Sequence, residues 1–136
     1  MGIGRKLRSL GRYIGLFENW WVVAFAPQSG APGGAARELR LRDGRRLWCH
    51  PSRNRESIGC VFVVGEYEPI LGRLPHPGAV RRVWDVGGNA GSFVIWAARH
   101  FPNARFTSFE PCPETAGILE RTRAANPGIA WDVHAF

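Results

Sequence analysis

The sequence predicts an α/β protein with a doubly wound parallel sheet that stops after its third strand, preceded by a helix and a β-hairpin. Two observations predict the sheet. From residue 80 onward, short β-prone segments alternate with segments of helical length, which is typical of βαβ units with right-handed crossovers. The first predicted strand also runs directly into a turn with three glycines in five positions. The predicted elements are strand 80–86, helix 91–100, strand 104–110, helix 113–125 and strand 129–135.

The predicted sheet is short for its class. Doubly wound sheets have about six strands, whereas the sequence from residue 80 to Phe136 has room for three. We therefore expect strand 80–86 to be an unpaired edge, because the strand that would flank it on the other side is missing. The missing C-terminal half would also supply one wall of the ligand crevice. We accordingly expect this chain alone to bind its ligand weakly and to have no turnover.

Residues 1–26 are predicted to form a basic amphipathic helical segment. Apolar residues recur there at spacings of three and four, with arginine and lysine on other faces. The stripe consists of Ile3, Leu7, Leu10, Ile14, Phe17 and Trp21. Packing of the stripe on the domain that follows is the more ordinary explanation. Peripheral contact with an anionic membrane is the alternative.

A linker and a lead-in are predicted next. Residues 27–36, "PQSGAPGGAA", have the composition of a flexible linker, and residues 37–79 are predicted as a β-rich lead-in to the sheet. Asp43-Gly44 indicates a hairpin, and a two-residue turn there would set Leu39 opposite Trp48 but Leu41 opposite Arg46, so the register stays open. The stretch 57–71 is compatible with either a strand or a helix.

Composition narrows the classes of partner. The net charge of +7 is concentrated in residues 1–55, which hold eleven arginines and lysines against three acidic residues. Residues 56–136 hold seven against eight. A basic stripe interleaved with stacking aromatics is missing, so we expect no nucleic-acid partner.

Cysteine usage and hydropathy favour a cytoplasmic protein. Cys49, Cys60 and Cys112 show no C-x-x-C spacing, so neither a disulfide framework nor a metal site is expected. Three such cysteines fit a reducing compartment. The apolar run "WWVVAFA" is shorter than a membrane span, and we expect no cleaved signal peptide because Pro27 would follow the cut.

The glycine turn, "VWDVGGNAGSF" (residues 83–93), indicates a ligand site. Gly87, Gly88 and Gly91 let the chain reverse sharply and let a ligand approach the backbone where a Cβ would collide. The helix that follows directs its unpaired N–H groups at the same crevice, which favours an anionic group.

Glu110 supplies the second half of this signal. It ends the second predicted strand, nineteen residues after Gly91. An acid at about twenty residues is expected when it accepts hydrogen bonds from ribose hydroxyls. The spacing therefore predicts a cofactor that contains a nucleoside. Turn geometry and helix capping alone are the alternative explanation of these residues.

The glycine spacing separates two cofactor classes. A dinucleotide fingerprint needs a second glycine at the position that Asn89 occupies, and no P-loop lysine is present. The pattern is D-x-G-x-x-x-G, from Asp85 through Gly87 to Gly91. It resembles motif I of the S-adenosylmethionine-dependent methyltransferases. The sequence is similar over residues 38–136 to the FkbM family of these Rossmann-like enzymes, in which D-V-G-x-N-x-G and F-E-P recur.

The resemblance implies a cofactor site and an activity. It implies that S-adenosylmethionine binds at Asp85, Gly87, Gly88, Asn89, Gly91 and Glu110, with Glu110 on the ribose. It also implies O-methyl transfer to a hydroxyl of a sugar or natural-product scaffold, so the expected partner is a small-molecule or glycan acceptor. The catalytic base is unknown, and the residues considered for it are His50, His76, His100, Asp132 and His134. Two alternatives stay open, a fragment of an NAD-dependent oxidoreductase and a non-catalytic basic module for membrane or nucleic acid.

Overall fold

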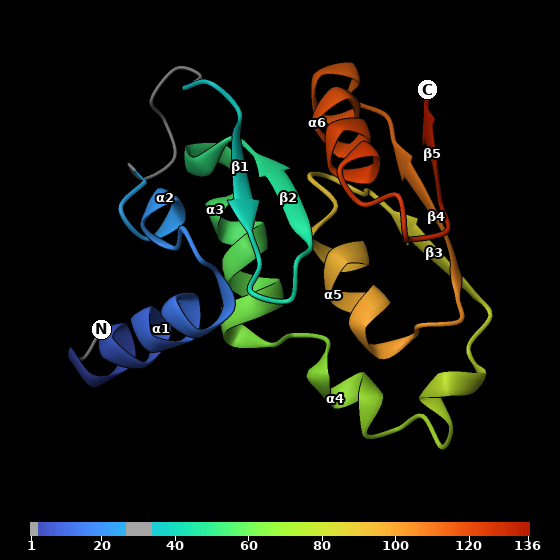
Figure 1. Cartoon of the computed structure of the whole chain (residues 1–136), viewed down its shortest axis with the longest axis horizontal. Coiled ribbons are helices and arrows are strands. Elements are labelled where there is room, and N and C mark those ends of the chain that lie inside the picture. Colours follow the sequence, from blue (N-terminus) through green and yellow to red (C-terminus); the bar gives the residue numbers. More distant parts are fainter. Residues whose placement is uncertain (1–2, 27–33) are drawn as a thin grey trace.

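The computed structural model describes residues 3–26 and 34–136, whose course Figure 1 shows. Its helical elements are α1 (Ile3–Leu16), α2 (Trp21–Ala24), α3 (Pro51–Ile58), the π-helix η1 (Gly59–Val64), α4 (Glu68–Leu71), the 3-10 helix η2 (Pro77–Ala79), α5 (Ser92–His100) and α6 (Pro113–Ala124). Its strands are β1 (Arg37–Arg40), β2 (Arg46–Cys49), β3 (Arg82–Val86), β4 (Arg105–Glu110) and β5 (Trp131–Ala135). Within the described ranges, no helix combines the length and the apolar character needed to cross a membrane.

The second half of the chain confirms the predicted α/β fold. β3, β4 and β5 form a parallel sheet in that order, with Val83 opposite Phe106 and Ser108 opposite Val133. Every element predicted after residue 80 is present, and the ends differ by at most two residues. β3 and β4 are each followed by a helix that returns the chain to the start of the next strand, which gives the βαβαβ order.

The two faces of this sheet differ in their exposure. α5 and α6 lie on the same side of it (Figure 1), and the β4 side chains of Phe106, Ser108 and Glu110 are buried there. Trp84 and Val86, on the opposite face of β3, are 73% and 83% exposed. β3 is also the edge of the sheet, as the sequence predicts.

The hairpin prediction is correct in place, and the register that the sequence left open differs from that of a two-residue turn. Leu39 of β1 lies opposite Leu47, not Trp48. A three-residue connection ending at Gly44, whose φ is 89°, replaces the two-residue turn. The one-residue shift decides which side chains share a face, because side chains alternate along a strand. The buried face now holds Leu39, Leu41, Leu47 and Cys49 together.

The lead-in is largely helical, so the prediction that residues 37–79 are β-rich is wrong beyond the hairpin. Pro51 opens α3 at a position where proline fixes a helical φ, and α3 passes directly into η1. Gly65, with a φ of 74°, ends this helix. Ile58 and Val61, which favoured a strand, are buried in the core, and their packing outweighs their intrinsic preference.

The N-terminal helices pack on the domain with part of their apolar stripe. Tyr13 and Phe17 of this segment are 8% and 0% exposed, and the Phe17 ring meets Phe62 of η1 edge-on at 5.4 Å between centroids. This contact confirms packing as one use of the stripe. Most of the predicted linker, residues 27–33, lies outside the described residues.

α6 joins the hairpin to the glycine turn through two buried side chains. The Asn126 amide, just after α6, donates to the Arg46 carbonyl at 2.7 Å and accepts from the Arg46 N–H at 3.0 Å. The Thr122 hydroxyl accepts from the Trp48 N–H at 3.0 Å and donates to the Ala90 carbonyl at 2.9 Å. The hairpin, α6 and the turn therefore form one hydrogen-bonded unit.

Candidate functional site

The turn between β3 and α5 is held by backbone hydrogen bonds to β4. The N–H groups of Gly87 and Gly88 both donate to the Phe109 carbonyl of β4, at 2.9 and 3.0 Å. Three residues of the turn have left-handed backbone angles, with φ of 81° at Gly87, 48° at Asn89 and 89° at Gly91. Asn89 is the non-glycine among them, and asparagine is the residue type that tolerates this region best after glycine.

The glycines of the turn have different surroundings. A Cβ added at Gly87 would meet no atom within 4 Å, so open space lies over its main chain. A Cβ at Gly88 would lie 2.9 Å from Leu119 of α6, and one at Gly91 would lie 2.6 Å from the Trp131 ring. Gly88 and Gly91 thus let the protein's own side chains approach, whereas Gly87 alone of the three leaves room for a ligand.

Glu110 is directed at the turn. Its Oε2 accepts from the Asn89 N–H at 2.9 Å, and its Oε1 accepts from the Cys112 N–H at 3.0 Å. The residue is 7% exposed. A carboxylate has about four acceptor positions, so these two donors leave acceptor capacity on both oxygens.

Asp85 lies beneath the turn. It is buried, and its Oδ2 accepts from the Ser108 hydroxyl at 3.0 Å, which in turn accepts from the Trp131 indole N–H at 2.9 Å. Burial raises the pKa of the Asp85 carboxyl, the Ser108 hydrogen bond opposes that rise, and the nearby Glu110 charge adds to it. The described contacts of Asp85 are with the protein itself, and they tie β3, β4 and β5 together below the turn.

Asn54 is, with Arg53 and Glu114, a residue of this site that the sequence did not reveal. Its amide nitrogen donates to the Asn89 side-chain oxygen at 2.7 Å, and its oxygen accepts from the His50 N–H at 2.7 Å. It is 7% exposed, and it stands at the centre of α3. It lies in the stretch that the sequence predicts as a β-rich lead-in, so no helix face could be assigned to Asn54.

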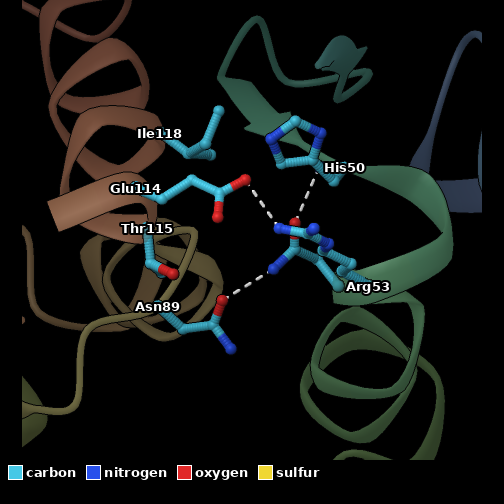
Figure 2. A pocket seen from close by; sticks show the side chains of 7 residues that line it. His50, Arg53, Asn89, Glu114, Thr115 and Ile118 are labelled. Carbon is cyan, nitrogen blue, oxygen red and sulfur yellow. Dashed lines mark hydrogen bonds and ion pairs between the residues drawn. The ribbon is translucent and has the colours of Figure 1, made fainter. Parts of the chain in front are cut away.

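A cavity of about 200 Å³ lies between α3, the turn and α6 (Figure 2). The ion pair of Arg53 and Glu114, at 2.6 Å, crosses it, and Asn89, which is hydrogen-bonded to Asn54, lies below that pair in the view of Figure 2. The lining residues are His50, Arg53, Asn54, Asn89, Glu114, Thr115 and Ile118. A larger hollow of about 390 Å³ between α1, η1 and α5 is lined by His100, one of the candidates for the base, and by none of the predicted cofactor-binding residues.

The five candidates for a catalytic base are scattered. His50 lines the cavity, with its Nδ1 2.9 Å from the Gly34 carbonyl. His134 stacks on Phe109, and Asp132 pairs with Arg105 on the exposed side of the sheet. His100 packs on Trp96, where burial lowers its pKa. His76 precedes η2. Among residues 3–26 and 34–136, no group of three or more potential metal ligands is arranged to hold an ion.

The arrangement can bind a polar ligand at the carboxyl ends of β3 and β4. It offers bare main chain at Gly87, a carboxylate at Glu110, and side chains of both charges in the adjoining cavity. This is the position where α/β sheets bind ligands.

Comparisons with known proteins give a likeness to a solved structure. No protein-family model matches the chain, and no curated protein matches it. Among solved structures, an S-adenosylmethionine-dependent methyltransferase, SibL in its apo form, superposes with a TM-score of 0.46 and 22% identity. The superposition covers 95% of this chain and 36% of that chain, so the chain spans about a third of the structure it matches.

Proposed function

We propose that this chain carries the cofactor-binding half of an S-adenosylmethionine-dependent methyltransferase of the FkbM type. The observation that carries the proposal is the hydrogen bond from the Asn89 N–H to Glu110, beside the open main chain of Gly87. It joins the turn after one parallel strand to an acid after the next strand. A nucleoside fits there because the ribose hydroxyls can donate to the free acceptor positions of the carboxylate.

The adjoining cavity fits the other end of this cofactor. The methionine end of S-adenosylmethionine carries a carboxylate and an ammonium group, and Arg53 and Glu114 offer one opposite charge to each. Ligand pockets usually enclose about 300–1,000 Å³, so a cavity of about 200 Å³ takes only part of the molecule. Asn54 and Glu110 would hold the turn in place from two sides.

The chemistry that we infer is O-methyl transfer. The bound cofactor supplies a methyl group on a sulfonium, and the rate depends on aligning an acceptor oxygen with that methyl. We infer a hydroxyl of a sugar or natural-product scaffold as acceptor from the resemblance to the FkbM family. The described residues orient the cofactor, and the base for the acceptor proton stays unassigned.

The structure favours this cofactor over a dinucleotide. Asn89 stands where the dinucleotide fingerprint has its second glycine. Its side chain is hydrogen-bonded to Asn54, and its backbone N–H is hydrogen-bonded to Glu110. That backbone N–H is therefore not free for a pyrophosphate. NAD should compete poorly for the site.

Titration by NMR tests the proposal residue by residue. We expect S-adenosylhomocysteine to shift the amide signals of Gly87, Asn89 and Cys112, with a dissociation constant in the millimolar range because β3 is an open edge. NAD should shift the same signals less at equal concentration. Shifts confined to residues outside the turn and the cavity, or no shifts at all, would contradict the proposal.

Two variants separate ligand contact from folding. Glu110→Gln should abolish the shifts at the turn, since it removes the charge and places an amide donor against one N–H group. Glu120→Gln should leave the shifts unchanged, because Glu120 is exposed on α6 and pairs with Arg123, away from the turn. A micromolar dissociation constant by titration calorimetry would overturn the expectation of weak binding while supporting the cofactor.

A further inference from the structure

The N-terminal helices expose large apolar side chains. Leu7 and Ile14 of α1 are 63% and 39% exposed, and Trp21 and Phe25 of the α2 region are 52% and 72% exposed. We call these four residues the N-terminal apolar surface. Leu7 and Ile14 are seven residues apart, so they lie on one side of α1.

This exposed stripe is separate from the face that packs on the domain. At about 100° per residue, Tyr13 lies roughly 100° around the helix from Ile14 on the domain side, and it is 8% exposed. The apolar face of α1 is therefore wider than the part of it that packs on the domain. The α2 region adds aromatic side chains that contact one another, since the Trp20 ring centroid lies 6.2 Å from that of Trp21 and 5.7 Å from that of Phe25.

Arginines border the N-terminal apolar surface. Arg8 and Arg12 are exposed on α1, roughly 100–140° from Leu7, and the Arg12 Nη1 donates to the Val63 carbonyl of η1 at 2.6 Å. The Arg42 side chain reaches α1 from the hairpin, and its Nε donates to the Ile14 carbonyl at 3.0 Å. α1 contains no acidic residue, and Glu18, which follows it, is paired with Arg40 at 3.3 Å. The border is thus positively charged.

We propose that α1 and α2 form a docking surface for an anionic phospholipid membrane. A helix that lies at a lipid interface combines a basic polar face with leucine, phenylalanine and tryptophan on the other face. Anionic headgroups complement the three arginines, and the acyl boundary accepts the four apolar side chains. A nucleic acid would use the arginines and would leave Leu7 and Ile14 in water. The inference does not depend on the proposed methyltransferase activity.

Vesicle sedimentation of the full chain tests this inference. We expect the chain to sediment with vesicles of phosphatidylserine and phosphatidylcholine, to bind pure phosphatidylcholine vesicles at least tenfold less, and to be released by salt. Each arginine near the surface should account for about a fivefold change in affinity, so Arg8→Gln should weaken binding by about that factor. Leu7→Gln combined with Ile14→Gln should weaken it by at least tenfold.

Matched control variants lie elsewhere on the molecule. Ile70→Gln replaces an apolar side chain of α4 that is 47% exposed, and Arg82→Gln removes an exposed charge from β3. Both should bind anionic vesicles like the unaltered chain. Circular dichroism checks that all variants fold, and we expect them to fold because the replaced side chains are exposed.

Three outcomes would overturn the inference. Equal binding to both kinds of vesicle would remove the role of the arginines, and unchanged binding of the Leu7 and Ile14 double variant would remove the role of the apolar side chains. Salt-sensitive binding to duplex or single-stranded DNA without binding to vesicles would assign the basic segment to nucleic acid instead.

Discussion

Replacing Gly87 or Gly91 by alanine should separate the two uses of the glycine turn. Both residues have left-handed φ, 81° and 89°, and alanine at either position pays about 1–2 kcal/mol for that conformation. At Gly91 the new Cβ would also lie 2.6 Å from the Trp131 ring and 3.2 Å from Leu119, so repacking adds about 1–3 kcal/mol. At Gly87 it would meet nothing within 4 Å.

We therefore expect Gly87→Ala to lower the free energy of unfolding by about 1–2 kcal/mol and Gly91→Ala to lower it by about 2–5 kcal/mol. Urea unfolding followed by circular dichroism measures both values. In the ligand titration, Gly87→Ala should remove the shifts caused by S-adenosylhomocysteine although the protein stays folded. Equal losses of stability would refute the packing argument for Gly91, and full ligand binding by folded Gly87→Ala would refute the ligand role of the open space.

Three further predictions concern buried polar groups and thiols. Burial raises the pKa of the Asp85 carboxyl, so the folded chain holds the carboxyl proton more tightly than the unfolded chain does. The free energy of unfolding therefore falls as pH rises from the ordinary aspartate pKa of about 3.9 to the raised value. The Asp85→Asn variant has no such carboxyl and lacks this loss. Its free energy of unfolding relative to the unaltered chain, measured by urea titration at several pH values, should increase over that interval and then level off. A difference that stays constant with pH would contradict the raised pKa. Asn54→Ala should cost about 1–3 kcal/mol and speed hydrogen exchange of the Asn89 N–H, since it removes the anchor of a left-handed residue, and unchanged exchange would argue against that anchor. Iodoacetamide should label Cys112 first and Cys49 only on unfolding, as followed by mass spectrometry, because hydrogen bonds from Thr115 lower the pKa of the exposed Cys112 thiol whereas burial raises that of Cys49 to about 12.

The parallel sheet could be predicted because its signals are local. Each strand and helix after residue 80 has its own periodicity, and Pro113 and the glycines mark where helices begin. The spacing of Gly91 and Glu110 follows from one βαβ unit, whose geometry varies little among proteins. The turn and the acid could thus be placed next to each other from the sequence, and the hydrogen bond between Asn89 and Glu110 confirms that proximity.

The first half of the chain could not be predicted equally well, because packing between distant segments decides it. The hairpin register depends on which leucines face α5 and α6, and the sequence of the hairpin alone permits two choices. The helical state of 51–64 depends on burial of Ile58 and Val61 against α1 and α5. Asn54 therefore remained hidden, since its partner Asn89 lies 35 residues away in the sequence.

The hydrogen bonds of the turn indicate that it holds its shape without a ligand. Asn54 anchors the Asn89 side chain, Glu110 anchors its N–H, and Trp131 fills the space beneath Gly91. A ligand at Gly87 would therefore lose little free energy in ordering the backbone, which favours binding. The open edge at β3 acts in the opposite direction, because a ligand beside Gly87 would keep the side that faces this edge in water. Covering that edge with further strands should raise affinity for the cofactor without changing the turn. The amide chemical shift of Asn89 should then stay the same while the dissociation constant of the cofactor falls.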